Sequence, residues 1–197
     1  MNDACEKCRR EGEKLLLKGE KCLGPKCTLI KRPYAPGQHG QGFRKKVSEY
    51  GRQLREKQKA RRIYGISESQ FSNYVKRANM MVGNNSENLI QLLEARADNV
   101  VYRLGFASSR AMARQFVSHG LFNIDGHKVK TPSIQVYEGA SIEPRKKAMF
   151  KETTLNSAIT WLDIDAKKLT GVVKHLPVRD EIDTPIQESL IIEFYSR

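Results

Sequence analysis

Long apolar runs are missing from this chain of 197 residues, and so is any excess of acidic side chains. No stretch approaches the roughly 20 apolar residues that a membrane-spanning helix needs, which argues against a membrane protein. Residues 1–5 have neither the apolar core of a secretory signal nor the composition of a transit peptide, so we expect a cytoplasmic protein. No cysteine follows Cys27, which confines cysteine chemistry to the start of the chain.

Basic residues are abundant instead. The chain has 35 Lys and Arg against 22 Asp and Glu, a net charge of +13. This charge favours a nucleic-acid partner or an acidic membrane surface over a small neutral substrate. The first 62 residues hold 18 of the basic and 7 of the acidic residues, a net of +11. The surplus charge is therefore local, and it shares its segment with all four cysteines. A chain of this length can bury one core or two small ones.

The four cysteines form two close pairs, Cys5-x2-Cys8 and Cys22-x4-Cys27. Two such pairs predict a tetrahedral site of four thiolates, and zinc is the ion we expect there. A bound ion would replace the hydrophobic core that a segment of about 25 residues cannot build. An iron–sulfur cluster uses the same ligands and is a minor alternative. Two disulfides or four inert thiols are the structural alternative, although a reducing cytoplasm disfavours disulfides.

A segment rich in Gly and Pro, residues 32–42, follows the last cysteine. It predicts an extended loop that becomes ordered only against a partner. His39 within this loop is a candidate metal ligand. Because four cysteines already complete a site, a solvated or RNA-contacting histidine is the preferred interpretation.

A strongly basic helix is predicted next, starting after Ser48, running to Tyr64 and closed by Gly65. Residues 44–62 carry nine basic and two acidic side chains, and like charges on one helix repel one another. An RNA phosphate backbone would relieve that repulsion, whereas a solvated helix face is the alternative. The candidate RNA-binding residues of this segment are Arg44, Lys45, Lys46, Arg52, Arg55, Lys59 and Arg62.

Apolar residues then recur at helical spacing, which predicts three short helices. Residues 67–70 fit a capping box at the first helix. Ser86 predicts the start of the second helix and Asp98 the start of the third, which ends before Gly105. The leucines and valines of these helices are expected to form a core.

A helix followed by a hairpin is predicted over residues 109–129. Ser109 fits an N-cap, and Asp125-Gly126 suits the positive φ angles of a two-residue turn between strands 121–124 and 127–129. The apolar side expected to face the core comprises Met112, Ala113, Phe116 and Val117. Arg110 and Arg114 share the outer face, and a solvated pair is the alternative to an RNA-contacting one. The candidate RNA-binding residues of this helix and hairpin are Arg110, Arg114 and Lys128.

The segment 141–176 carries little motif information. Its apolar residues predict strands around Ile142, Leu162, Ile164, Val172 and Leu176, with a helix between them at about residues 149–159. No function is assigned to this segment from the sequence.

Several long motifs follow one another along the chain. Besides the cysteine spacing, they are Arg32-Pro33-Tyr34, Pro36-Gly37-Gln38-His39-Gly40, Leu54-Arg55-Glu56-Lys57-Gln58-Lys59, Arg61-Arg62-Ile63-Tyr64-Gly65-Ile66-Ser67-Glu68, Asp98-Asn99-Val100-Val101-Tyr102-Arg103-Leu104-Gly105-Phe106-Ala107 and Ile192-Glu193-Phe194-Tyr195-Ser196-Arg197. Together these motifs resemble the bacterial small-subunit ribosomal protein S4 family, and the likeness covers essentially the whole chain.

The resemblance implies an α+β fold with three parts. These are a zinc-binding N-terminal arm and loop over 1–45, a mainly helical domain over 46–93 completed by 176–197, and an inserted α/β RNA-binding domain over 94–175 that carries the helix and hairpin. The four cysteines place the chain in the metal-binding subset of the family.

The resemblance also implies a role and partners. It implies a structural constituent of the small ribosomal subunit, a primary binder of 16S-type ribosomal RNA that helps nucleate assembly of the subunit body. Neighbouring small-subunit ribosomal proteins are implied partners, as is messenger RNA where it enters the ribosome, and a contribution to decoding accuracy is implied. No small-molecule substrate and no membrane partner are expected.

Two other classes of protein compete with this interpretation. An RNA-modifying enzyme such as a pseudouridine synthase carries the same helix and hairpin, but it needs a catalytic domain for which too little chain remains. A free-standing RNA-binding or stress protein would have no need of the cysteine arm.

Overall fold

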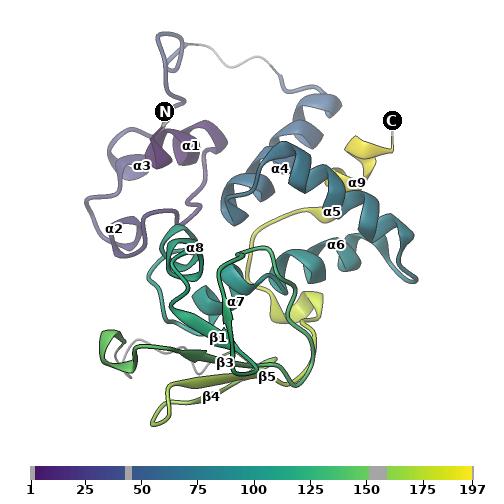
Figure 1. The fold of residues 1–197 in the computed structure, drawn as a ribbon. Coiled ribbons are helices and arrows are strands. Elements are labelled where there is room, and N and C mark those ends of the chain that lie inside the picture. Colours follow the sequence, from purple (N-terminus) through teal and green to yellow (C-terminus); the bar gives the residue numbers. More distant parts are fainter. Residues whose placement is uncertain (1–2, 43–45, 151–158, 197) are drawn as a thin grey trace. The chain divides into compact units, whose positions relative to one another are not determined.

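The computed structural model describes residues 3–42, 46–150 and 159–196 (Figure 1). The chain divides into two compact units. The first unit comprises Met1–Val75 together with Pro185–Arg197, and the second comprises Lys76–Thr184. The first unit is therefore completed by the C-terminal end of the chain. Within the described residues, no helix is both long and apolar enough to cross a membrane.

The first unit begins with the cysteine arm, which contains α1 (Ala4–Glu11), α2 (Glu20–Leu23) and α3 (Thr28–Lys31). Its buried apolar side chains are three of the cysteines and one leucine, namely Cys8, Cys22, Cys27 and Leu15. The arm thus has hardly any hydrocarbon core, as its composition predicted.

The loop after α3 differs from the extended segment that its composition predicted. Arg9 Nε donates to the carbonyl of Tyr34 at 3.0 Å, and the Arg9 guanidinium stacks on the Tyr34 ring at 4.7 Å from its centroid. The chain then turns back on itself, and a Cβ at Gly40 would lie 1.8 Å from the carbonyl oxygen of Ala35. These contacts give the segment a turned conformation and not an extended one, and its ordering against a partner stays a prediction.

The basic helix α4 (Glu49–Tyr64) forms as predicted. The Ser48 hydroxyl accepts from Gly51 N at 3.2 Å, and Gly65 closes the helix in the left-handed conformation with φ 64°. The C-terminal helix α9 (Glu188–Tyr195) packs on α4, and Lys57 lies 4.5 Å from the ring centroid of Phe194. Helix α5 (Glu68–Met80) follows, with Gln70 N donating to the Ser67 hydroxyl at 3.3 Å.

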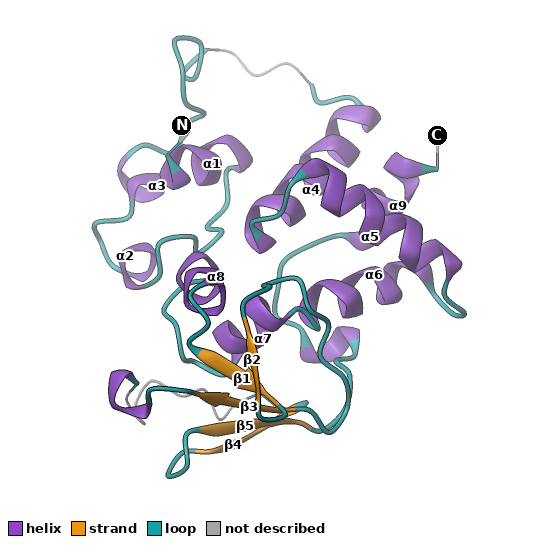
Figure 2. Cartoon of the chain, viewed as in Figure 1, coloured by secondary structure: helices purple, strands orange, loops and turns teal. Residues whose placement is uncertain are grey.

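The second unit places short helices against an antiparallel sheet (Figure 2). Its helical elements are α6 (Asn85–Glu94), α7 (Ala97–Arg103), α8 (Arg110–Ser118) and the 3₁₀ helices η1 (Lys147–Met149) and η3 (Arg179–Glu181). Its strands are β1 (Phe122–Ile124), β2 (His127–Val129), β3 (Ser141–Pro144), β4 (Leu162–Asp165) and β5 (Thr170–Val173), in the sheet order β2-β1-β3-β5-β4. The core contains Leu104, Phe122, Ile142 and Trp161.

The predicted hairpin is confirmed by strands β1 and β2. Phe122 pairs with Val129, Ile124 pairs with His127, and Asp125 and Gly126 make the turn with φ angles of 50° and 78°. Two consecutive positive φ angles are the signature of the turn that Asp-Gly favours, because they match the twist of the strands.

Some local predictions were wrong. Asn84, and not Ser86, caps α6, because the Asn84 side chain accepts from the backbone N–H of Ser86 at 3.0 Å. Asp98 lies inside the first turn of α7, whose N-cap residue is Arg96. Met112 is 39% exposed, although Ala113 and Val117 face the core as predicted.

Farther along the chain, the strands around Ile142, Leu162, Ile164 and Val172 are confirmed, but Leu176 lies outside any strand. Most of the helix predicted at 149–159 falls on residues 151–158, which lie outside the described part of the chain.

Candidate nucleic-acid interface and cysteine cluster

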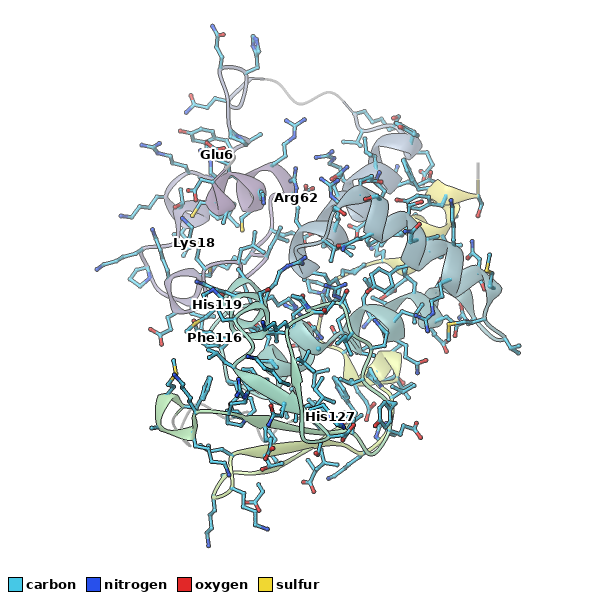
Figure 3. All side chains as sticks on the ribbon, in the orientation of Figure 1. Glu6, Lys18, Arg62, Phe116, His119 and His127 are labelled. Carbon is cyan, nitrogen blue, oxygen red and sulfur yellow. The ribbon has the colours of Figure 1, made fainter. Side chains whose placement is uncertain are left out.

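The four cysteines of the arm line one cavity. All four are free thiols; Cys8, Cys22 and Cys27 are buried and Cys5 is half-buried. The cavity also has apolar walls, and its other lining residues are Ala4, Leu17, Lys18, Lys21, Thr28 and Leu29. Lys18, labelled in Figure 3, marks this part of the arm. Thiols that lie 22 positions apart in sequence, Cys5 and Cys27, thus share one small space.

Hydrogen bonds and charge act on these thiols. The backbone N–H of Lys18 donates to Cys22 Sγ at 3.3 Å, a contact that favours a thiolate. Burial raises the pKa of the Cys8 thiol, a backbone hydrogen bond from Leu15 lowers it, and thiolate charge at the other three cysteines raises it further. Four thiolates in one cavity would repel one another, so a cation among them would relieve a real electrostatic cost.

The fit of a metal to this cavity has two sides. The donor set, four thiols, is the one that zinc prefers in structural sites. Among the residues described, however, no three His, Cys, Asp or Glu side chains converge closely enough to hold a metal ion. The cysteines share a cavity without adopting ligand geometry, so the metal site stays a prediction.

The cations on α4 meet acidic side chains of the arm. Arg55 and Arg62 both form ion pairs with Glu11, whose side chain is almost fully buried. Arg62 points from α4 toward α1, and it also donates to the carbonyl of Lys7 at 3.4 Å (Figure 3). Burial raises the pKa of the Glu11 carboxyl, and the charges of Arg62 and Arg55 act against that rise. Formation of the ion pair between Arg62 and Glu11 removes both side chains from water, and this desolvation opposes their mutual attraction.

Lys59 is the most deeply placed of the predicted RNA-binding cations. It is 6% exposed, and its Nζ lies 2.8 Å from Glu13 Oε2 and 3.2 Å from Glu56 Oε1. Burial lowers the pKa of Lys59, but these two carboxylates outweigh burial and raise it. Arg55, Lys59 and Arg62 therefore share one side of α4, and that side faces Glu11 and Glu13.

Other predicted cations of this segment are open to solvent. Lys46 and Arg52 are exposed, and Arg52 has only a long contact of 3.7 Å with Glu49. Arg44 and Lys45 lie outside the described residues. The contact of all seven residues of this segment with RNA stays a prediction.

The two arginines of α8 are less alike than their spacing predicted. Arg110 has a 14% exposed side chain; its Nε donates to Asn99 Oδ1 at 2.8 Å and its guanidinium lies 4.5 Å from the ring centroid of Tyr102. Arg114 is 35% exposed and lies 3.7 Å from Asp98 Oδ2. Arg110 is therefore largely built into the unit, whereas Arg114 reaches its surface.

A buried carboxylate organises this region and was missed from the sequence. Glu94 accepts from Arg103 Nε at 2.8 Å, from Arg103 Nη2 at 2.9 Å and from Asn99 Nδ2 at 2.7 Å, and Arg110 approaches it to 3.7 Å. Burial lowers the pKa of Arg103, but hydrogen bonds and charge from Glu94 and Asp183 outweigh burial and raise it. The available sequence signal was a charged residue directly after Leu92-Leu93.

Lys128 lies exposed on strand β2, as a phosphate-binding residue requires. The nearby positive charges of Arg145 and Lys130 lower the pKa of its ammonium group. The hairpin therefore carries a local concentration of positive charge.

A short helix followed by a tight hairpin, with a half-buried arginine reaching the surface of the helix and an exposed lysine on the hairpin, is typical of a compact RNA-binding module in an α+β protein. Comparisons with known proteins agree. Residues 2–94 match the family described as "Ribosomal protein S4/S9 N-terminal domain", and residues 95–142 match the "S4 domain". The chain belongs to the ribosomal protein S4 family, as its motifs predicted.

Relatives match over nearly their whole lengths. The small ribosomal subunit protein uS4 of Syntrophomonas wolfei subsp. wolfei is 52% identical over 204 residues, which covers 100% of this chain and 98% of the relative. The protein of the same name from Clostridioides difficile is 54% identical over 201 residues, covering 98% of this chain and 97% of the relative. That from Geotalea daltonii is 53% identical over 203 residues, with the same coverage.

Proposed function

We propose that this chain is a primary binder of 16S-type ribosomal RNA that helps nucleate assembly of the small-subunit body. It is a structural constituent of the small ribosomal subunit and not an enzyme. The observation that carries this conclusion is identity above 50% to proteins named small ribosomal subunit protein uS4 along essentially the whole chain. The matched S4 domain and the helix and hairpin within it support RNA as the bound partner.

Binding proceeds without covalent chemistry. Exposed Lys and Arg side chains neutralise phosphates, and the counterions released from the RNA supply much of the affinity. Folded RNA is recognised through backbone geometry, exposed bases and 2′-hydroxyls, so the shape of the two units supplies specificity. The predicted contacts best placed for this role are the exposed cations Lys46, Arg52 and Lys128, followed by the half-buried Arg114.

The arm is proposed to hold a zinc ion through Cys5, Cys8, Cys22 and Cys27. Three observations support the proposal: the thiols line one cavity, most of them are buried, and the arm has little hydrocarbon core. When bound, the ion would supply a cross-link between α1, α2 and α3. The hydrogen bond from Lys18 N would then stabilise the ligating sulfur of Cys22.

Finer roles are proposed on family grounds alone. These are contact with neighbouring small-subunit ribosomal proteins, contact with messenger RNA where it enters the ribosome, and a contribution to decoding accuracy.

Sedimentation tests the main proposal. A tagged chain expressed in cells should travel with the small subunit and stay with it through a high-salt wash, because a primary binder is held by many RNA contacts at once. An RNA-modifying enzyme or a stress factor would remain mostly in the supernatant, and that distribution would refute the proposal.

A further inference from the structure

Three cationic side chains converge on the backbone of Gly120, just after the end of α8. Arg145 Nη1 donates to the carbonyl oxygen of Gly120 at 3.3 Å, and Arg145 N donates to the carbonyl of Leu121 at 2.8 Å. A Cβ at Gly120 would lie 2.6 Å from Lys128 Cε and 3.2 Å from Lys130 Cγ. Lys128, Lys130 and Arg145, hereafter the Gly120 cluster, therefore surround one point of the chain.

Glycine is what lets these side chains approach. Gly120 has a φ of +68°, a conformation that other residues rarely adopt, and it has no side chain to exclude the lysine stems. All three cations of the Gly120 cluster are exposed. The site is thus open to a ligand larger than an ion.

The Gly120 cluster differs from the other cations of the module in its lack of counter-charge. Arg110 and Arg114 each approach a carboxylate, at Glu94 and Asp98. Across the described ranges, no Asp or Glu oxygen forms an ion pair with Lys128, Lys130 or Arg145.

One carboxylate lies in the same row of the sheet as Lys128 but is already engaged. Asn123 pairs with Lys128 on one side and with Glu143 on the other, and Asn123 Nδ2 donates to Glu143 Oε1 at 3.4 Å. The positive charges of Arg145 and Lys130 lower the pKa of Lys128, because like charges this close repel one another. An anion is what would relieve this repulsion.

The end of α8 explains only part of this arrangement. A helix C-terminus carries about half a negative charge, which favours a single nearby cation. The Gly120 cluster has three cations where the helix end favours one, so its remaining positive charge is available to an external anionic ligand.

We propose that the Gly120 cluster binds backbone phosphates of the small-subunit ribosomal RNA, with Lys130 and Arg145 as contacts alongside Lys128. This inference rests on the proposed RNA-binding function and locates one of its contact points. The arginine presents a planar fork suited to phosphate oxygens, and the lysines act as flexible point charges beside it.

A matched pair of triple variants of the full-length chain tests the inference. The first changes Lys128, Lys130 and Arg145 to Gln. The control changes Lys167, Lys168 and Lys174 to Gln, three exposed cations of the same unit, of which two have a carboxylate nearby, at 3.6 Å and 3.5 Å. Both variants remove three positive charges. Affinity for transcribed 16S-type ribosomal RNA is measured over a range of salt concentrations, and melting temperature is measured in parallel.

The slope of log affinity against log salt should become shallower by about 2 to 3 in the cluster variant and change little in the control, at about 0.7–0.9 per lost phosphate contact. Equal changes in both variants, or an unchanged slope in the cluster variant, would overturn the inference while RNA binding itself stood. A marked fall in melting temperature with an unchanged slope would show that the three cations stabilise the C-terminus of α8 and do not bind RNA, and this result would also overturn the inference. A wild-type chain that bound an unrelated RNA of equal length as tightly would instead overturn the proposed function.

Discussion

Arg103 and Glu94 form a bidentate ion pair whose N–O distances are 2.8 Å and 2.9 Å, and their side chains are only 9% and 0% exposed. The pair joins the last residue of α6 to the last residue of α7. The same carboxylate also accepts from Asn99 and is approached by Arg110, so one buried charge draws together side chains of α7 and α8.

Removing the charge of Glu94 should destabilise the second unit strongly. Breaking one side of a buried pair costs about 3–5 kcal/mol, because Arg103 would be left with the carboxylate of Asp183, which is exposed to solvent. We expect E94Q to lower the free energy of unfolding by that amount in urea titrations. Asp163→Asn, at an exposed carboxylate of the same unit that is 3.5 Å from Lys174, should cost about 0.5 kcal/mol or less. Similar losses of unfolding free energy in both variants would show that Glu94 contributes no more to stability than an exposed carboxylate does.

The two arginines of α8 should separate in their effect on stability. Arg110→Gln removes a hydrogen bond to Asn99, a contact with Glu94 and stacking on Tyr102, so we expect a loss of about 1–3 kcal/mol. Arg114→Gln should change the free energy of unfolding by about 0.5 kcal/mol or less, because its side chain reaches solvent. Thermal melting of the two single variants measures the difference, and equal melting temperatures would argue against a structural role for Arg110.

Acid should loosen the first unit through Glu68. Its carboxylate receives Lys57 at 2.7 Å, Arg61 at 2.9 Å and the Tyr195 hydroxyl at 2.8 Å. Burial raises the pKa of Glu68, but these partners outweigh burial and hold it below the ordinary value of 4.5. A lowered pKa in the folded state gives stability that is fully present above the unfolded value and is lost as pH falls through the folded one.

The prediction for E68Q follows from that sign. The wild type should lose more stability than E68Q when the pH falls from about 5 to about 3, because only the wild type must protonate this carboxylate on the way. Urea titrations at the two pH values measure the loss. Glu20→Gln, at an exposed carboxylate of the same unit, serves as the control and should follow the wild type. A loss in E68Q as large as that of the wild type would contradict the assignment.

Metal analysis tests the cysteine cluster. Purified, reduced, chelator-free protein should contain one zinc ion per chain, and Cys22→Ser should lose it and unfold the arm while the second unit keeps its melting transition. Structural zinc binding can contribute about 10 kcal/mol to a small site, which is more than this arm's core can replace. Thr28→Ser, at a residue that lines the same cavity, should retain the metal. Absence of metal from the wild-type protein would refute the proposed zinc site.

The sequence predicted those parts of the molecule whose signals are local. Ser48 and Gly65 cap the two ends of α4, and Asp125-Gly126 makes the hairpin turn. Both features could be predicted because caps and turns depend on a few adjacent residues. The prediction that Met112 faces the core was wrong. Helical spacing shows which side of α8 faces the core, but it does not show how wide a strip of that side is buried.

The electrostatic partners could not be predicted in the same way. Arg62 and Glu11 are 51 positions apart, and their pairing depends on how α1 packs against α4. A run of basic residues therefore predicted a uniform binding surface, whereas the structure divides it into cations with internal carboxylate partners, such as Lys59, and cations open to solvent, such as Lys46. The Gly120 cluster was likewise hidden, because β2 and β3 bring Lys128 and Arg145 together from separate segments.

Competition between ribosomal RNAs tests the central claim most directly. The full-length chain is mixed with equal amounts of transcribed small-subunit and large-subunit ribosomal RNA at physiological salt, and the RNA retained with it is quantified. Nonspecific attraction to phosphate acts on both RNAs equally, so only recognition of folded structure can separate them. The account predicts strong enrichment of the small-subunit RNA, with one chain bound per RNA, and equal retention of the two RNAs would contradict it.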